Sequence, residues 1–254
     1  MSLELFRLDH QVAMVTGAHQ GIGQAIAVGL AEAGADIVAV DRSEPVETCD
    51  AVEELGRRFI WRRVDLGAAS VGQLDAVVDE TVEEMGRLDI LVNNAGTIRR
   101  APAVEYSEAD WDAVMEINLK SLFFLTQAAG RHMLRQGHGK VIHIASVLSY
   151  QGGILVPAYT AAKHGVAGLT RALANEWAAQ GVNVNAIAPG YVETSNTAAL
   201  RADPERKPAI TARIPAGRWA VPADLVGAAV FLASRASDYV HGTVLRVDGG
   251  WLGR

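Results

Sequence analysis

A tyrosine and a lysine four residues apart are the residues whose types and spacing most directly suggest chemistry. Tyr159 and Lys163 follow Pro157 in a segment whose apolar residues suit a helix. On a helix, positions i and i+4 share a face, with Cβ atoms about 5–6 Å apart. An ammonium at that distance is expected to lower the tyrosine pKa from its ordinary value of about 10. The pair predicts a general acid/base, with a core tyrosine beside a lysine as the alternative.

A serine upstream strengthens the catalytic interpretation. Residues 140–145 form an apolar run typical of a buried strand, and Ser146 stands where that strand should end. In open parallel α/β sheets, ligands bind outside the carboxyl ends of the strands. Ser146 and the helix that carries Tyr159 and Lys163 are therefore expected to face one substrate carbonyl.

A glycine-rich turn near the N-terminus predicts a nucleotide site. An expected strand at 12–16 is followed by Gly17, Gly21 and Gly23, and then by a helix that ends before Gly34. Glycines at such a turn let the backbone approach a pyrophosphate, which binds at the helix N-terminus. The spacing is T-G-x-x-x-G-x-G rather than G-x-G-x-x-G, and a purely structural turn is the alternative.

Asp41 predicts which nicotinamide cofactor is preferred. It follows the second expected strand, residues 36–40, where a carboxylate can accept hydrogen bonds from the adenosine ribose hydroxyls. A 2′-phosphate would meet this negative charge, so NAD(H) is predicted over NADP(H). Arg42 complicates this prediction, because an arginine beside the site could partly accommodate a phosphate.

The remaining segments alternate between strand and helix patterns, which predicts an α/β fold with a parallel sheet. The helix expected at 110–136 should break near Gly130, and Asn118 inside it should be either exposed or locally bonded. Residues 191–215 have weak periodicity and suggest a substrate lid. No linker or repeat divides residues 1–254, which predicts one domain. Other expected helices are 44–56, 71–85 and 223–233, and other strands are 59–63, 90–92, 182–187 and 243–247.

Composition argues against several other classes of function. The net charge of −6 makes nucleic acid an improbable partner. Cys49 is the only cysteine, which excludes an intrachain disulfide and a thiolate metal cluster, and no residue set suggests a metal site. The uncharged stretch 141–162 is interrupted by Gly152, Gly153 and Pro157, so it is not expected to span a membrane. The N-terminal residues lack an apolar signal segment, and a cytoplasmic location is expected.

Five separated motifs together resemble those of the short-chain dehydrogenase/reductase family along the whole chain. The resemblance implies a doubly wound (Rossmann) seven-stranded parallel sheet flanked by helices. It also implies a homo-oligomer, for which we expect a homotetramer. The motifs are Thr16-Gly17-x-x-x-Gly21-x-Gly23, Asn93-Asn94-Ala95-Gly96, Asn118, Ser146 with Tyr159-x-x-x-Lys163, and Pro189-Gly190.

This resemblance also implies roles for single residues. Tyr159 would be the general acid/base, Lys163 would hold the nicotinamide ribose and Ser146 would bind the substrate oxygen. Asn118 would support a water in a proton relay from Lys163, and Asn94 would brace the cofactor pocket. The residues implied to bind the cofactor are Thr16, Gly17, Gln20, Gly21, Ile22, Gly23, Asp41, Asp65, Leu66, Asn93, Ala95, Gly96, Tyr159, Lys163, Pro189, Gly190, Val192 and Thr194.

Other segments narrow the resemblance to the 2-dehydro-3-deoxy-D-gluconate 5-dehydrogenases, also named 2-deoxy-D-gluconate 3-dehydrogenases. The activity implied is hydride transfer between nicotinamide and a secondary carbinol carbon of a deoxy sugar acid. The segments that carry this narrower resemblance are residues 98–100, 151–154, 200–203, 214–219 and 248–252.

A sugar-acid substrate needs a cation for its carboxylate, and the guanidinium of arginine can bind a carboxylate through two parallel hydrogen bonds. Arg99 and Arg100 follow the fourth strand and are the first candidates, ahead of Arg213 and Arg218, while Gln151 is a candidate for the sugar hydroxyls. Two alternatives stay open. One is the same chemistry on another polyol, a 3-oxoacyl thioester or a steroid; the other is a non-catalytic regulatory protein that binds the cofactor.

Overall fold

The strands are apolar runs of the kind found in parallel sheets that have helices on both faces. The computed structural model describes residues 3–253, and in it four of the strands (β1, β4, β5 and β6) are buried at every position. The edge strand β3 is only half-buried. The strands are β1 (Val12–Thr16), β2 (Asp36–Asp41), β3 (Phe59–Arg63), β4 (Ile90–Asn93), β5 (Gly139–Ile144), β6 (Val182–Pro189) and β7 (Val244–Val247).

These strands form one parallel sheet in the order β3-β2-β1-β4-β5-β6-β7. The chain builds outward from β1 to β3, and then returns to the other side of β1 to add β4. This is the doubly wound topology predicted above. Ligands bind such sheets at the crevice where the strand order reverses, here between the carboxyl ends of β1 and β4.

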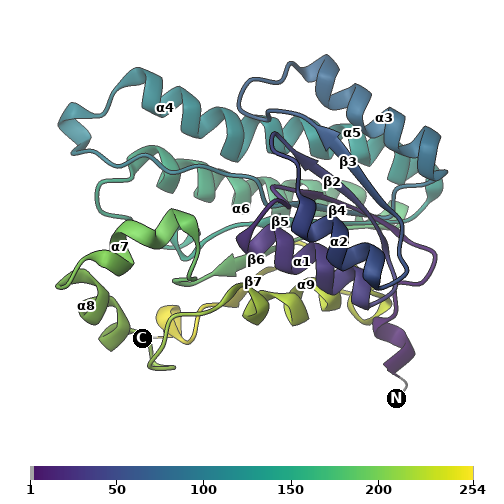
Figure 1. Ribbon diagram of the computed structural model, residues 1–254. Helices are drawn as coiled ribbons and strands as arrows, with labels where there is room; N and C mark the ends of the chain where they lie inside the picture. Colours follow the sequence, from purple (N-terminus) through teal and green to yellow (C-terminus); the bar gives the residue numbers. More distant parts are fainter. Residues whose placement is uncertain (1–2, 254) are drawn as a thin grey trace.

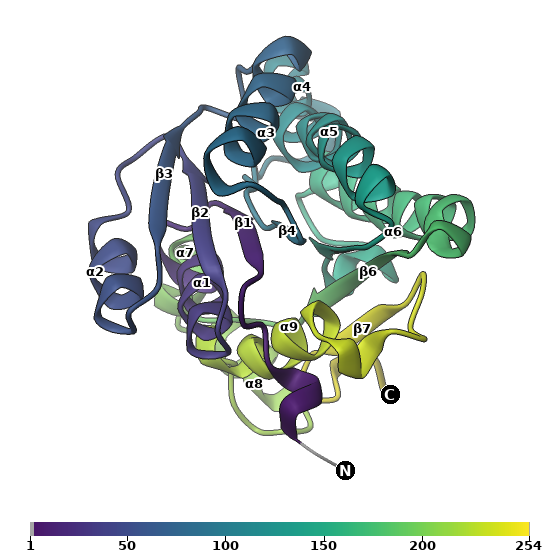
Figure 2. The same ribbon diagram turned by 90° about the vertical axis from the view of Figure 1, so that its right-hand side faces the viewer.

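Two helical layers cover the sheet (Figures 1 and 2). One apolar core packs α1 and α9 against one face, and a second core packs α3, α5 and α6 against the other. The layer on the first face comprises α1 (Gly21–Glu32), α2 (Val46–Glu54) and α9 (Val226–Ala233), and the other layer comprises α3 (Val71–Met85), α4 (Glu108–Met115), α5 (Ser121–Gln136) and α6 (Pro157–Trp177).

Helix α3 has the predicted bounds because both of its ends are capped locally. The side chains of Ser70 and Gln73 each accept a hydrogen bond from the other residue's backbone N–H, which forms a capping box. Gly86 ends the helix in the left-handed conformation, with φ 79°. These two caps are visible in the sequence, so this helix is confirmed from residue 71 to residue 85.

The prediction of a helix broken near Gly130 is wrong. The chain is helical from α4 through α5, and its irregularity is instead a π-helical turn at Glu116–Lys120. Gly130 is a packing residue, since a Cβ there would lie 2.6 Å from Cη2 of Trp177 on α6. A glycine in a helix can serve close packing as well as a break, and the sequence pattern does not separate these two uses.

Several predicted ends move by a few residues. The helix predicted at 44–56 is shorter, and the strand predicted at 182–187 continues to Pro189 because it pairs there with β7. The segment predicted as a lid contains two short helices, α7 (Ala198–Ala202) and α8 (Arg206–Arg213), which lie outside both layers at one end of the molecule (Figure 1). Within residues 3–253 no helix has the length and apolarity needed to cross a bilayer.

Candidate active site

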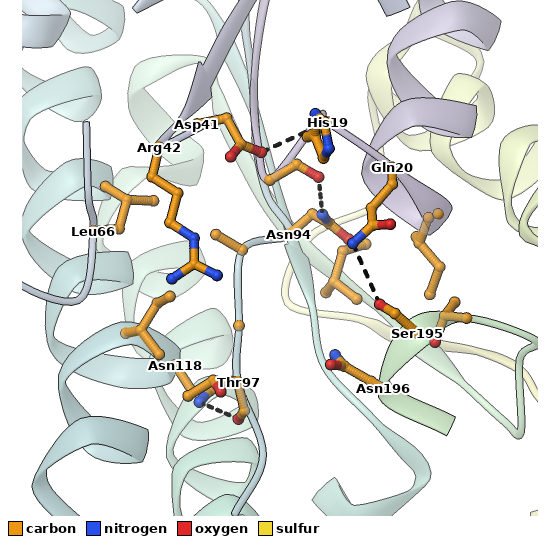
Figure 3. Close-up of a pocket in the computed structure, with 18 of the residues that line it drawn as sticks. His19, Gln20, Asp41, Arg42, Leu66, Asn94, Thr97, Asn118, Ser195 and Asn196 are labelled. Carbon is orange, nitrogen blue, oxygen red and sulfur yellow. Dashed lines mark hydrogen bonds between the residues drawn. The ribbon is translucent and has the colours of Figure 1, made fainter. Parts of the chain in front are cut away.

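A cavity of about 770 Å³ opens beside the carboxyl ends of β1, β2 and β4 (Figure 3). Its walls come from the glycine turn, from these strand ends, from α6 and from the segment after β6. The predicted residues that line it are Gly17, Gln20, Gly21, Ile22, Asp41, Asp65, Leu66, Ala95, Gly96, Asn118, Tyr159, Lys163 and Thr194. Residues far apart in the sequence are thus brought to one site.

Some predicted cofactor residues lie behind the cavity wall and hold it in place. The Thr16 hydroxyl accepts hydrogen bonds from the backbone N–H groups of Asn94 and Ala95, both at 2.9 Å, so it joins the ends of β1 and β4. The Asn93 side chain donates to the Thr126 hydroxyl at 2.9 Å and is buried. Pro189, Gly190 and Val192 are likewise absent from the lining.

All three glycines of the turn disfavour a side chain, two through their backbone conformation and Gly23 through lack of space. Gly17 and Gly21 have φ of 66° and 64°, which disfavours any residue with a Cβ. A Cβ on Gly23 would lie 2.1 Å from the carbonyl oxygen of Gly17 and 2.4 Å from Nδ2 of Asn94. Nδ2 of Asn94 donates to the carbonyl oxygens of Thr16 and Gly17 at 3.0 and 3.1 Å. The turn thus presents the N-terminus of α1 to the cavity, which suits a diphosphate.

Asp41 lies at the end of β2, at the other side of the glycine turn. Its carboxylate accepts hydrogen bonds from the backbone N–H groups of His19 and Ser43, both at 3.1 Å. The side chain of Arg42 points into the cavity (Figure 3). A carboxylate and a guanidinium therefore meet any ligand at this end.

The Tyr159 and Lys163 side chains lie on one face of α6, and Ser146 directly follows Ala145 at the end of β5. Nζ of Lys163 is buried, donates to the carbonyl oxygen of Ile144 at 2.6 Å and lies 5.5 Å from the centre of the Tyr159 ring. The Ser146 hydroxyl accepts a hydrogen bond from the backbone N–H of Leu148 at 3.1 Å and is hydrogen-bonded to the Tyr159 hydroxyl. The predicted serine, tyrosine and lysine therefore converge.

The prediction that Lys163 lowers the pKa of Tyr159 is wrong for this structure. Burial raises the pKa of Tyr159 to about 12, although the hydrogen bond with Ser146 and the charge of Arg100 both act to lower it. Burial also lowers the pKa of Lys163 to about 8. Removing both groups from water disfavours both charged forms, and the lysine donates to a backbone carbonyl rather than to the phenol.

Asn118 lies at the centre of the π-helical turn and is locally bonded, the second of the two possibilities given above. Its Nδ2 donates to the carbonyl oxygen of Thr97 at 2.8 Å (Figure 3). It also donates to the carbonyl oxygen of Val114 at 2.8 Å. Its Oδ1 is buried and has no hydrogen-bond partner among residues 3–253. A π-helical turn inside an α-helix is often found at functional sites. This orphan acceptor faces Gly96, where a Cβ would lie 2.6 Å from it.

The candidate arginines differ in their partners in the structure. Arg99 is paired with Asp110 at 3.4 Å, and Arg218 binds Asp224 through two hydrogen bonds of 2.7 and 2.8 Å. Arg100 donates to the backbone carbonyl oxygen of Asn196 at 3.2 Å, and burial together with the charge of Arg206 lowers its pKa. Because the charge of Arg100 also acts on Tyr159, Arg100 is the arginine of this group that lies towards the acid/base pair.

Gln151 connects the loop after β5 to the segment predicted as a lid. Its Oε1 accepts a hydrogen bond from Arg213 at 3.4 Å, and the Arg213 guanidinium lies 4.0 Å above the Trp251 ring. The Trp251 ring packs against Tyr191, with ring centres 4.7 Å apart. These contacts join Gln151, Arg213 and the C-terminal tail into one cluster, which does not line the cavity.

Sequence interpretation missed several lining residues. These residues belong to no recognisable motif. The signal that could have identified them is their position in the sequence next to the glycine turn, to Asn94 or to the segment after β6. Among them are His19, Ser43, Thr97, Ile117, Glu193, Ser195, Asn196 and Arg201.

Comparisons with known proteins agree with this geometry. The family profile described as Enoyl-(Acyl carrier protein) reductase matches residues 17–252. The chain is 56% identical to 2-dehydro-3-deoxy-D-gluconate 5-dehydrogenase of Escherichia coli (strain K12), over 100% of both chains. A structure from Agrobacterium tumefaciens, provisionally assigned as a 2-deoxy-D-gluconate 3-dehydrogenase and solved with bound NADP, is 58% identical with a TM-score of 0.92 and coverage of 98% of this chain and 99% of that one.

A third relative is a gluconate 5-dehydrogenase from Burkholderia cenocepacia in complex with NADP and tartrate. It is 42% identical, has a TM-score of 0.95 and covers 100% of both chains. The doubly wound sheet, the glycine turn and the converging serine, tyrosine and lysine are what the motifs in the sequence led us to expect. This chain belongs to the short-chain dehydrogenase/reductase family of oxidoreductases.

Proposed function

We propose that this protein is an NAD(P)-dependent dehydrogenase that interconverts a secondary alcohol and a ketone on a deoxy sugar acid of the 2-dehydro-3-deoxy-D-gluconate type. The observation that carries the proposal is that Tyr159 and Lys163 line the same cavity as the glycine turn. The E. coli relative supports the choice of substrate, since identity extends over the whole of both chains.

The residues present fit a nicotinamide dinucleotide. The turn formed by Gly17, Gly21 and Gly23 and the N-terminus of α1 would hold its diphosphate, Asp41 would meet the adenosine ribose, and Lys163 would hold the nicotinamide ribose. The bound cofactor supplies the hydride donor or acceptor. Asp41 favours NAD(H) by repelling a 2′-phosphate, whereas Arg42 and the NADP-bound Agrobacterium relative favour NADP(H). We propose NAD(H) as the preferred form.

Two side chains would act on the substrate oxygen, and a third would support the proton relay. During reduction, the Tyr159 hydroxyl would donate its proton to that oxygen as the carbonyl carbon receives the hydride. The Ser146 hydroxyl would donate a hydrogen bond to the same oxygen, while its own oxygen is held by the N–H of Leu148. The orphan Oδ1 of Asn118 is an acceptor suited to a water that passes protons from Lys163 to solvent.

Arg100 would bind the carboxylate of the sugar acid. Its guanidinium lies near enough to Tyr159 to influence the pKa of that tyrosine, and its Nη2 donates to the backbone carbonyl oxygen of Asn196. Arg206 adds a second positive charge close to Arg100. Gln151 stays a candidate for the sugar hydroxyls, and residues 191–215, with α7 and α8, would form the lid. We further propose a homotetramer in the cytoplasm.

Replacement of Tyr159 by phenylalanine tests the proposed reaction. General acid/base groups typically contribute about 10²–10⁴-fold to rate, so kcat for reduction of the keto sugar acid should fall at least about 100-fold in Y159F. NADH binding, measured by fluorescence titration, should be retained. The fully exposed Tyr239 provides the matched control, and Y239F should have wild-type kcat. Normal turnover by Y159F would refute the proposed proton donor.

Replacement of Arg100 by glutamine tests the proposed substrate class. A hydrogen bond to a charged group is worth about 1.5–3 kcal/mol, so kcat/KM for the sugar acid should fall about 10- to 100-fold further than that for a neutral six-carbon polyol, on which only the change in the Tyr159 pKa acts. The neighbouring R99Q is the control, since Arg99 is paired with Asp110. Equal losses on the acid and the polyol would contradict carboxylate binding by Arg100, and a preference for acyl thioesters would contradict the sugar-acid assignment itself.

A further inference from the structure

Arg201, on the short helix α7, is a cation that lines the cavity. Its Nη2 donates to the carbonyl oxygen of Thr194 at 3.1 Å, and its Nη1 lies 4.0 Å from Oε2 of Glu193. Its Nε is shielded from solvent and has no hydrogen-bond partner among residues 3–253. Leaving a buried donor unpaired is unfavourable, because the donor has lost its hydrogen bonds to water. The guanidinium is therefore held in position with unused donor capacity.

Contacts of the neighbouring segment place Arg201 near the diphosphate end of the cavity. Nε2 of Gln20, in the glycine turn, donates to the Ser195 hydroxyl at 3.4 Å (Figure 3). The Thr194 side chain also faces this turn, since a Cβ on Gly21 would lie 3.5 Å from its Cγ2. Thr194, whose carbonyl oxygen accepts the hydrogen bond from Arg201, therefore lies beside the first residue of α1.

The charges in this corner favour an anion. The N-terminus of α1 carries the positive end of the helix dipole and free backbone N–H groups. Arg201 adds a full positive charge from the opposite wall, and Glu193 is the carboxylate that stands beside it, at the limit of an ion pair. A diphosphate between the two walls would supply the acceptor that the guanidinium lacks. Arginine is well suited to this because it can form two parallel hydrogen bonds to phosphate.

We propose that Arg201 binds the diphosphate of the dinucleotide from the lid side, and thereby couples cofactor binding to the ordering of residues 194–213. This inference rests on the proposed function, because it assumes that the cavity holds a nicotinamide dinucleotide. Helix α7 has only five residues, which is too short to be stable alone. The position of the lid therefore depends on contacts of this kind, and a ligand that bonds to Arg201 would stabilise it.

The test uses the full-length protein and two ligands that lack the nicotinamide ring. ADP-ribose carries the diphosphate, and adenosine does not. R201Q should bind ADP-ribose at least about tenfold more weakly than wild type, the loss expected for a hydrogen bond to a charged group. The ADP-ribose affinity of R201K should lie between those of wild type and R201Q. Both variants should bind adenosine as wild type does. K207Q is the matched control, because Lys207 is an exposed cation of the same segment that does not line the cavity.

Hydrogen exchange of peptides covering residues 194–213 provides the second measurement. ADP-ribose should slow exchange in wild type and in K207Q, and should have little effect in R201Q. Unchanged ADP-ribose affinity in R201Q with a raised KM for the sugar acid would make Arg201 a substrate residue and overturn the proposal. Equal loss of adenosine binding would show damage to the whole cavity and also overturn it. Failure of wild type to bind NADH or ADP-ribose would instead refute the proposed dinucleotide site.

Discussion

Burial, more than the neighbouring charge, sets the acidity of Tyr159. Its pKa is raised to about 12, while that of Lys163 is lowered to about 8. The role of Lys163 that the structure shows directly is to hold α6 in place. Its ammonium donates a hydrogen bond to the carbonyl oxygen of Ile144 and so connects α6 to the end of β5. The Ser146 hydrogen bond and the Arg100 charge are the groups that lower the tyrosine pKa. Arg100 therefore links substrate recognition to the acid/base residue.

The opposed charges of Asp41 and Arg42 provide a residue-scale prediction about the cofactor. Asp41→Asn removes the charge that repels a 2′-phosphate and keeps one of the two oxygens that accept hydrogen bonds from the N–H groups of His19 and Ser43. The ratio of kcat/KM with NADP to that with NAD should rise about tenfold, as expected when roughly 1.4 kcal/mol of repulsion is removed.

The reciprocal variant, Arg42→Gln, should lower the same ratio, because it removes the cation that points into the cavity. Steady-state kinetics with both cofactors measure the two effects. A wild-type enzyme that prefers NADP, together with an Asp41→Asn variant of unchanged ratio, would show that Asp41 does not select the cofactor.

At the scale of elements, the first turn of α1 depends on the absence of a side chain at Gly23. Gly23→Ala would place a Cβ 2.1 Å from a backbone carbonyl oxygen, a contact that the turn cannot relieve without moving Gly17. We expect NADH binding to be lost in a fluorescence titration, with a lower melting temperature.

Gly72→Ala is the matched control for this substitution. Gly72 lies in α3, and a Cβ there would meet nothing within 4 Å. Alanine is favoured over glycine in a helix by about 1 kcal/mol, so this variant should keep its NADH affinity and be at least as stable as wild type. Wild-type NADH affinity in Gly23→Ala would mean that the turn does not cradle the cofactor.

At the scale of the whole molecule, the candidate site and a buried charged side chain lie at opposite ends of the sheet. The candidate site lies at the carboxyl ends of the strands, whereas the buried Asp89 joins segments at the amino ends. Its carboxylate accepts hydrogen bonds from the N–H of Val12 at 2.8 Å and from Arg87 at 2.7 and 2.8 Å, and it lies 2.7 Å from Nε2 of His138. One side chain therefore connects the starts of β1, β4 and β5.

Acid should weaken this connection. Burial alone would raise the pKa of Asp89, but the hydrogen bonds from His138, Arg87 and Val12 outweigh it and the pKa is lowered. A lowered folded-state pKa stabilises the fold above the ordinary value of about 4, and that stability is lost as pH falls through the folded-state pKa. Asp89→Asn should therefore lower the free energy of unfolding at pH 7 by about 2 kcal/mol, and the difference from wild type should shrink below about pH 4.

Urea unfolding at a series of pH values measures this effect. Asp75→Asn is the control, since Asp75 forms a more exposed ion pair with Arg131 at 2.9 Å; such pairs contribute about 0–1 kcal/mol. A constant difference between Asp89→Asn and wild type from pH 7 to pH 3 would contradict the proposed linkage.

The sequence by itself determined the features that depend on neighbouring residues. The caps of α3, the glycine turn and the apolar strands follow from backbone sterics and from periodicity, which act over a few residues. The i, i+4 spacing likewise placed Tyr159 and Lys163 on one face of α6. Family motifs added the strand topology, which local patterns alone do not specify.

Only the tertiary structure decided the features that depend on what surrounds a side chain. Desolvation raised the pKa of Tyr159, whereas the neighbouring lysine was expected to lower it. Gly130 is a glycine because it packs closely against Trp177. Arg201 lies near the glycine turn because a segment about 180 residues later in the chain contacts that turn. The physical reason is that burial, packing and electrostatic fields are set by groups far apart in the chain. Spacing along the sequence does not contain that information.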